Sequence, residues 1–145
     1  MRVSIRFPMA IHSLLYVATF SPEMRVTSSI VADSIGANAV IVRNLFIDLS
    51  KNGLLIASAG KNGGVILAKE TKDITLWDIY QSVEKSNVDD IFKIYEGNQD
   101  CPVGKNFYQL IYPHMEDSIH AMEESMKQVT IQTLLDELKE NLEKL

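Results

Sequence analysis

Apolar residues recur every three or four positions over three stretches in the first half of the chain. The stretches cover residues 7–20, 28–35 and 39–51, and this spacing is typical of helices that are buried along one face. The buried positions are predicted to be Ile11, Leu14, Leu15, Ala18, Ile30, Val31, Ala32, Ile35, Val42, Leu45, Phe46 and Leu49. The pattern therefore predicts a mainly α fold that begins with three helices.

The second and third of these helices have clear start and stop signals. Thr27 or Ser28, and then Asn38, can each cap a helix by accepting a hydrogen bond from a free backbone N–H. Gly36 lies between them and can adopt the positive φ of a helix end. Two helices joined by a few residues that include a glycine, with the small Ala32 where they approach, are typical of a helix-turn-helix. Other compact three-helix domains have the same spacing, so both interpretations stay open at this point.

A pair of short strand-like runs follows the third helix directly. Residues 54–58 and 65–68 are separated by Ala-Gly-Lys-Asn-Gly-Gly at 59–64, and Asn-Gly strongly favours a hairpin turn. A phosphate-binding loop is the alternative, but the glycine spacing differs from that motif and no helix begins directly after it. The sequence therefore predicts a winged helix-turn-helix domain over residues 1–84.

Between this domain and the longest apolar stripe, the sequence predicts one helix and an ambiguous segment. Residues 75–78 (Thr-Leu-Trp-Asp) resemble a capping box. Trp77 is expected to pack in the core or at an interface. Residues 89–96 are compatible with a strand or an extended chain, and residues 97–100 with a loop.

The longest periodic stretch begins after Pro102 and is close to a heptad repeat. Pro113 lies within it and predicts either a kink or a break between two helices. Thr130 is the expected cap of a final helix over residues 131–142. This final helix is expected to face inward through Leu134, Leu135, Leu138 and Leu142.

The stripe on the long helix is the predicted subunit interface. Its members are Ile111, Met115, Ile119, Met122 and Met126. A chain of 145 residues has little left to cover so long a stripe, so we expect it to pack against the same helix of a second copy. Residues 85–145 are therefore predicted to be a linker and a helical dimerisation region.

The composition excludes several classes of protein. Of the residues, 46% are apolar and 23% are charged, and charges interrupt every apolar run well before the roughly 18 residues that a membrane span needs. The first eight residues lack the apolar segment of a signal peptide. The single cysteine, Cys101, cannot form an intrachain disulfide or supply a four-thiolate metal site by itself. We therefore expect a cytoplasmic protein without a membrane partner, a metal or a cofactor.

The charge is divided unevenly along the chain. The net charge is −5, but residues 1–72 carry +4 and residues 73–145 carry −9. A basic half can approach phosphates through counterion release while the acidic half stays away from them. This asymmetry indicates contact with nucleic acid, and chance segregation of surface charge is the alternative.

Side chains that could support catalysis or metal binding are isolated in the sequence. His12 lies within the first helix and has no partner placed as a nucleophile. His120 has Glu116 and Glu124 four residues to either side, which could hold a divalent metal but is common in solvated acidic helices. We therefore expect that the protein is not an enzyme.

Three segments, in this order, resemble the Rrf-two family of bacterial transcription regulators. They are residues 49–55 (Leu-Ser-Lys-Asn-Gly-Leu-Leu), the glycine-rich residues 60–67 and residues 73–79 (Asp-Ile-Thr-Leu-Trp-Asp-Ile). The resemblance covers nearly the whole chain and implies a homodimeric winged-helix protein that binds double-stranded DNA. Residues 101–105 resemble a firmicute branch of the family. Cluster-binding members carry three cysteines in this region, where the chain has only Cys101, so the resemblance carries over no iron–sulfur cluster.

The predicted DNA contacts are the residues opposite the buried stripe of the third helix, together with the hairpin turn. Arg43 can bond two acceptors on guanine and Asn44 can bond adenine, and the first turn of such a helix usually enters the major groove. Ala59 stands where cluster-type family members place a minor-groove arginine, so Lys61 is expected to meet phosphates. The predicted DNA-binding residues are Ser28, Ser29, Asn38, Ala39, Val40, Arg43, Asn44, Lys51, Lys61 and Asn62.

The sequence leaves two interpretations of Cys101. It is a redox sensor whose thiol pKa is lowered by Lys105 and by the dipole of a helix beginning at Pro102, or a position without a role. The function that the sequence favours is that of a homodimeric repressor which recognises a pseudo-palindromic operator. The alternative is a regulatory protein-interaction module that controls a partner enzyme or regulator through the acidic second half.

Overall fold

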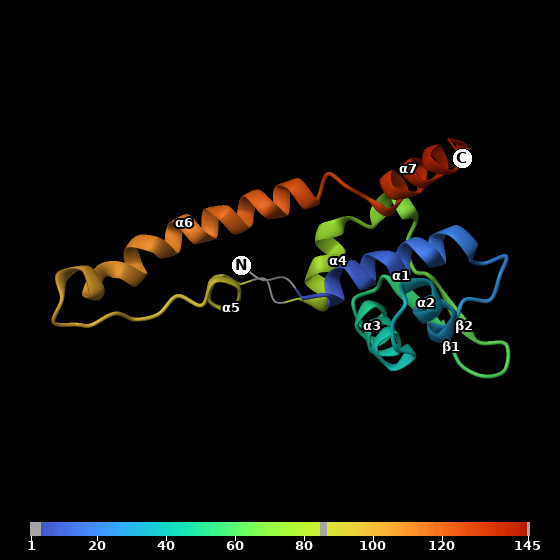
Figure 1. Cartoon of the computed structure of the whole chain (residues 1–145), viewed down its shortest axis with the longest axis horizontal. Coiled ribbons are helices and arrows are strands. Elements are labelled where there is room, and N and C mark those ends of the chain that lie inside the picture. The colour runs from blue at the N-terminus through green and yellow to red at the C-terminus, as the bar shows by residue number, and fades with distance from the viewer. Residues whose placement is uncertain (1–3, 85–86, 145) are drawn as a thin grey trace.

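Helices α1 (Arg6–Phe20), α2 (Ser28–Ile35) and α3 (Ala39–Lys51) enclose the hydrophobic core from which the rest of the molecule extends (Figure 1). The computed structural model describes residues 4–84 and 87–144. The centre of the core contains side chains with no exposed surface, namely Leu14, Val17, Val31, Val42, Leu45 and Leu49. The three helices predicted from the apolar spacing are therefore confirmed.

Side-chain caps set the limits of α2 and α3. The Thr27 hydroxyl accepts a hydrogen bond from the Ile30 N–H at 3.4 Å, and Asn38 Oδ1 accepts one from the Val40 N–H at 2.7 Å. Gly36 ends α2 in the left-handed region with φ of 81°. The two helices are bent by 115° relative to each other, which is the geometry of a helix-turn-helix.

Strands β1 (Leu55–Ser58) and β2 (Gly64–Leu67) form an antiparallel hairpin, called the wing below. Ile56 lies opposite Ile66 in the register, and both side chains are about half exposed. Val65, on the other face of the hairpin, is buried in the core. The wing therefore packs on α1 and α3 through one face and leaves the other open.

Helix α4 (Leu76–Val83) packs against α1 and α3. The predicted capping box is present, because the Thr75 hydroxyl accepts from the Asp78 N–H and the Asp78 carboxylate accepts from the Thr75 N–H. Trp77 is buried and its ring stacks on Tyr80 with 5.3 Å between the ring centroids. The predicted packing role of the tryptophan is confirmed.

The segment predicted as a strand or an extended chain, residues 89–96, instead begins within a short helix, α5 (Val88–Phe92). Asn87 caps it, with Oδ1 accepting from the Asp90 N–H at 2.8 Å. Lys93 ends it at φ of 53°. The extended interpretation is therefore wrong for the first part of the segment, since this cap provides a helix start that apolar spacing alone does not reveal.

Helix α6 (Pro102–Met126) projects away from the winged domain, and α5 with the chain that follows it lies along its side (Figure 1). The helix continues through Pro113, so the predicted break is absent. A proline removes one backbone hydrogen bond. Tyr112 and Met115 on either side of it pack against the core and support the turn.

The expectation that nothing in the chain covers the stripe on α6 is wrong for the end nearest the winged domain. Ile119 is only 7% exposed, and Met115, Met122 and Met126 pack against the core. The physical reason is that α4 and α5 of the same chain pack against α6. These side chains therefore already contact their own chain.

Helix α7 (Ile131–Glu143) returns to the winged domain and packs on α1 and on the short 3-10 helix η1 (Thr71–Asp73). Leu135 is buried, but Leu142 is 58% exposed, which corrects the prediction that it faces inward. Leu142 lies in the last turn of α7, after Leu134, Leu135 and Leu138, which are buried or partly buried. The predicted boundary between residues 84 and 85 adjoins residues 85 and 86, which lie outside the described part of the chain.

Two reciprocal backbone hydrogen bonds hold the start of α7 against the start of α4. The Leu76 N–H donates to the Val129 carbonyl and the Ile131 N–H donates to the Ile74 carbonyl, both at 2.9 Å. Together they form an isolated antiparallel bridge that pairs Thr75 with Thr130. The end of α6 is thereby tied to the winged domain.

Within the described residues no single helix is long and apolar enough to cross a membrane, and α2 with α3 has that length and composition only when the two are counted together across their bend.

Candidate nucleic-acid interface

Helix α3 presents one complete face to solvent. At about 100° per residue, the residues opposite its buried stripe fall along one line. This outward line contains Val40, Asn44, Ile47 and Lys51. Val40 is 53% exposed and Ile47 is 47% exposed, so this face is free of contact with the core.

An ion pair removes the acidic residue of α3 from this face. Asp48 lies at the side of the helix and pairs with Arg6 at the start of α1. Both side chains are partly exposed, so the pair contributes little to stability, but it neutralises the acid and joins α3 to α1. Arg43 and Lys51 have no acidic partner within the described part of the chain. The outward face of α3 therefore stays positively charged.

A hollow of about 350 Å³ lies between part of α3 and the wing. Ala57 and Val65 of the wing form one wall, and Ile47 lies on the opposite wall. The remaining lining residues are Arg43, Phe46, Ser50 and Lys51. The exposed lining is apolar, and the cations Arg43 and Lys51 border it. The hollow can therefore receive an apolar part of DNA, such as a sugar or a base methyl group, next to an anionic phosphate.

The wing is attached to the loop between α1 and α2. The Val65 N–H donates to the Val26 carbonyl at 2.9 Å, and Arg25 Nε donates to the Gly63 carbonyl at the hairpin turn. Gly64 permits this close approach, since a Cβ there would lie 2.7 Å from the Val26 carbonyl oxygen. Arg25 is not among the residues predicted from the sequence, because its partner lies 38 residues later in the chain.

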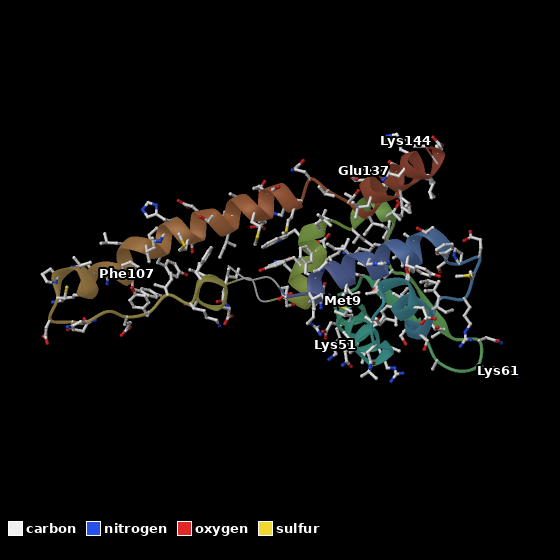
Figure 2. The ribbon with its side chains drawn as sticks, in the orientation of Figure 1. Met9, Lys51, Lys61, Phe107, Glu137 and Lys144 are labelled. Carbon is white, nitrogen blue, oxygen red and sulfur yellow. The ribbon has the colours of Figure 1, made fainter. Side chains whose placement is uncertain are left out.

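The wing turn and the outward face of α3 lie on the same side of the molecule. Figure 2 shows Lys61 at the turn of the wing and Lys51 on α3, both on the lower side, with Glu137 and Lys144 of α7 on the opposite side. Helix α7, which belongs to the acidic second half of the chain, therefore lies on the other side of the winged domain from these two lysines.

The structure brings the predicted DNA-binding residues to the N-terminus of α2, the outward face of α3 and the wing turn. Two of them, Ser28 and Ala39, are partly buried. The exposed ones are Ser29, Asn38, Val40, Arg43, Asn44, Lys51, Lys61 and Asn62. The contacts that these residues make with DNA stay predictions.

Comparison with known protein families and relatives shows to which family this chain belongs. A family model described as "Rrf2: Iron-dependent Transcriptional regulator" matches residues 3–137. The chain belongs to the Rrf2 (Rrf-two) family of transcriptional regulators. YwnA of Bacillus subtilis (strain 168), which is named as a candidate HTH-type transcriptional regulator, is 31% identical over 137 residues, covering 94% of this chain and 98% of the relative.

Solved structures of similar proteins show the same fold. A candidate transcriptional regulator from Lactobacillus plantarum has a TM-score of 0.80 at 26% identity, over 93% of this chain and 90% of the other. The IscR of T. potens has a TM-score of 0.69 at 22% identity, over 97% and 90% of the two chains, and this likeness concerns the fold alone. The predicted winged helix-turn-helix fold is therefore confirmed, as is the resemblance to the Rrf2 family.

The donors of this Rrf2-family chain do not fit an iron–sulfur cluster. Such clusters are held by several thiolates, with imidazoles replacing some of them in certain centres, and the chain has one cysteine. Within the described residues no group of three His, Cys, Asp or Glu side chains could hold a metal ion. This includes the spacing of Glu116, His120 and Glu124, which the sequence analysis left open.

Cys101 lies exposed at the N-terminus of α6, as its N-cap residue. The backbone N–H groups of Gly104 and Val103 lower the pKa of its thiol. The predicted direction is confirmed, and the first turn of the helix is the cause. Lys105 is not among the groups that produce the shift.

Proposed function

We propose that this Rrf2-family protein is a cytoplasmic, homodimeric repressor that binds a pseudo-palindromic operator in double-stranded DNA. The observation that carries the proposal is the shared side of α3 and the wing, where Arg43, Lys51 and Lys61 form no ion pair within the described part of the chain. A surface with unneutralised cations next to an exposed helix is suited to a phosphate-lined groove.

In this proposal α3 enters the major groove. Asn44 on its outward line is placed to bond adenine, and Arg43, beside the hollow, is placed to bond guanine or the phosphate that passes the hollow. The first turn begins with Asn38 and Ala39, which bring backbone close to the DNA. Ser28 and Ser29 offer the free N–H groups at the start of α2 to another phosphate.

The wing contacts the DNA next to the helix. Lys61 and Asn62 are exposed at its turn and would meet phosphates. Arg25 acts as a positioning residue, because its bond to Gly63 fixes the turn on which Lys61 sits. The wing of this chain is thus held by an arginine from outside the hairpin, while Ala59 leaves the hairpin itself without one.

The proposed dimer forms through the projecting part of α6. Ile111 of the predicted interface is partly exposed, and Val103 and Leu110 on the same helix are 70% and 65% exposed. Large apolar side chains exposed on a projecting helix favour contact with a second copy. The predicted interface residues Met115, Ile119, Met122 and Met126 would then support α6 from the side of its own chain.

Cys101 is proposed as a redox sensor of this regulator. Its exposed position and lowered thiol pKa favour oxidation, since the thiolate is the reactive form. It lies at the end of α6 that is farthest from the α4–α7 contact, so a signal would reach α3 through α6.

The function is tested by selecting duplexes from a randomised pool and measuring the affinity of the retained sequence as a function of salt. Arg43→Ala should weaken binding to that sequence by about 1–3 kcal/mol and relax the sequence preference. Lys61→Ala should weaken all sequences alike and lower the slope of log affinity against log salt by about 0.9. Retention of no duplex would contradict the proposal and favour the regulatory protein-interaction module.

A further inference from the structure

We infer that Val40 and Ile47 of α3 contact the 5-methyl groups of two thymines in each half of the operator. This inference rests on the proposed DNA-binding function and adds the class of base that the surface prefers. It starts from the aliphatic side chains that the outward line of α3 presents among its polar ones.

The two side chains occupy equivalent places on the helix. They are seven residues apart, which is two turns, so they lie on one line with Asn44 between them. Each is about half exposed although α3 also has a fully buried stripe. Ile47 lines the hollow beside the wing, and Val40 lies in the first turn, next to the cap at Asn38.

The positive charge near Val40 and Ile47 favours DNA as the partner of these two side chains. Arg43 and Lys51 line the same hollow as Ile47, Lys61 lies on the same side of the molecule, and Asp48 is paired with Arg6. An apolar protein surface gains nothing from these cations, whereas a nucleic-acid backbone does. In the major groove the thymine methyl is the one apolar group that a base presents, and aliphatic side chains contact it.

The distance between Val40 and Ile47 along α3 predicts how far apart the two thymines lie in the operator. Seven residues of helix rise about 10.5 Å, and base pairs are stacked about 3.4 Å apart. Because a recognition helix lies along the groove, where the path per base pair is longer than this axial rise, the two methyl groups should lie two to about three base pairs apart, with an A·T pair bonded by Asn44 between them. Such a half-site is rich in A·T pairs because aliphatic side chains contact the thymine methyl groups, in addition to the hydrogen bonds that Asn44 makes.

The experiment uses the wild-type protein and the duplex selected from the randomised pool. Each thymine is replaced in turn by deoxyuridine, which keeps the base pair and removes only the methyl group. Two positions that lie two to about three base pairs apart should each lose about fourfold in affinity, the value expected for one buried methyl. The other positions should change little.

Matched variants assign each methyl to its side chain. Val40→Ala should bind the unmodified duplex more weakly and should lose its sensitivity to deoxyuridine at one of the two positions, and Ile47→Ala at the other. Ile56→Ala is the control, because Ile56 is similarly exposed at 50% but lies on the face of the wing turned away from the hollow. This control should keep both sensitivities.

The outcomes separate the inference from the function on which it rests. Specific binding with equal affinity for every deoxyuridine duplex would overturn the inference and leave the proposed function intact. The same holds if the sensitivities persist unchanged in Val40→Ala and Ile47→Ala. If the wild-type protein retains no duplex at all, both are overturned, and the aliphatic face of α3 is a surface for a protein.

Discussion

Replacing Arg25 with alanine should loosen the wing without disturbing α3. Arg25 Nε donates to the Gly63 carbonyl and is the side-chain link between the hairpin turn and the loop before α2. A hydrogen bond of this kind contributes about 1 kcal/mol net. For a chain of this size, the loss corresponds to a fall in Tm of about 3 °C and, if the wing must be ordered to bind, to about a fivefold loss of DNA affinity.

A double-mutant cycle with Lys61 shows whether Arg25 acts by positioning the wing. In the wild-type background Lys61→Ala should lower the salt slope by about 0.9, which is one phosphate contact. In the Arg25→Ala background the same change should lower it by clearly less, because the turn that carries Lys61 is no longer held. Fluorescence anisotropy with a labelled operator at several salt concentrations measures all four slopes.

Lys69→Ala is the matched control for charge. Lys69 follows β2 and lines a separate hollow on the α1 side of the wing, so its removal should leave the slope unchanged. The positioning role of Arg25 would be refuted if Lys61→Ala costs the same in both backgrounds. It would also be refuted if Lys69→Ala lowers the slope of log affinity against log salt as much as Arg25→Ala does. The loss of one positive charge anywhere on the winged domain would then explain the effect of Arg25→Ala.

Three further predictions concern the dimer, the thiol and the cap of α3. Leu110→Glu should convert the dimer to a monomer in sedimentation experiments at unchanged Tm of the winged domain, because Leu110 is 65% exposed in the single chain; a dimer that survives would place the interface elsewhere. Alkylation of Cys101 should follow a pH profile with a midpoint below the value of about 8.5 for a free thiol, since its pKa is lowered, and its rate should fall as pH drops through that midpoint. Cys101→Ser should abolish any loss of DNA binding caused by peroxide, and a wild-type protein that binds equally well before and after peroxide would exclude the sensor. Asn38→Ala should lower stability by about 1 kcal/mol, measured by thermal unfolding, while Asn38→Asp keeps the cap and should retain it; equal losses would show that the cap at 2.7 Å contributes nothing.

The elements predicted correctly from the sequence are those whose signals are local. The caps at Thr27 and Asn38 and the helix end at Gly36 involve partners within four residues. The wing also follows from its own turn sequence. Each of these features depends on neighbours in the chain, so the apolar period and the turn residues are sufficient to find it.

Most of the features that were not predicted from the sequence depend on partners far away in the chain; helix α5, with its local cap at Asn87, is the exception. Arg25 is paired with a carbonyl in the wing, and Arg6 with Asp48 on α3. Ile119 was expected to be covered by a second copy, but it is already buried in the single chain, where α4 and α5 both contact α6. Leu142 fits the helical period and is nevertheless exposed. Periodicity shows which face of a helix is apolar, but the element that covers this face depends on the tertiary fold.

The bridge between Thr75 and Thr130 fixes the C-terminal end of α6 to the winged domain, while its N-terminal end projects away from that domain. The helix has 25 residues and is about 37 Å long, so a rotation of about 5° around the bridge moves its far end by about 3 Å. If the far ends of two copies are held together, the same rotation must appear as a displacement of the winged domains. In the proposed dimer, a rearrangement beside Cys101 that turned α6 by this angle would shift the two winged domains, and with them the two proposed recognition helices, relative to each other.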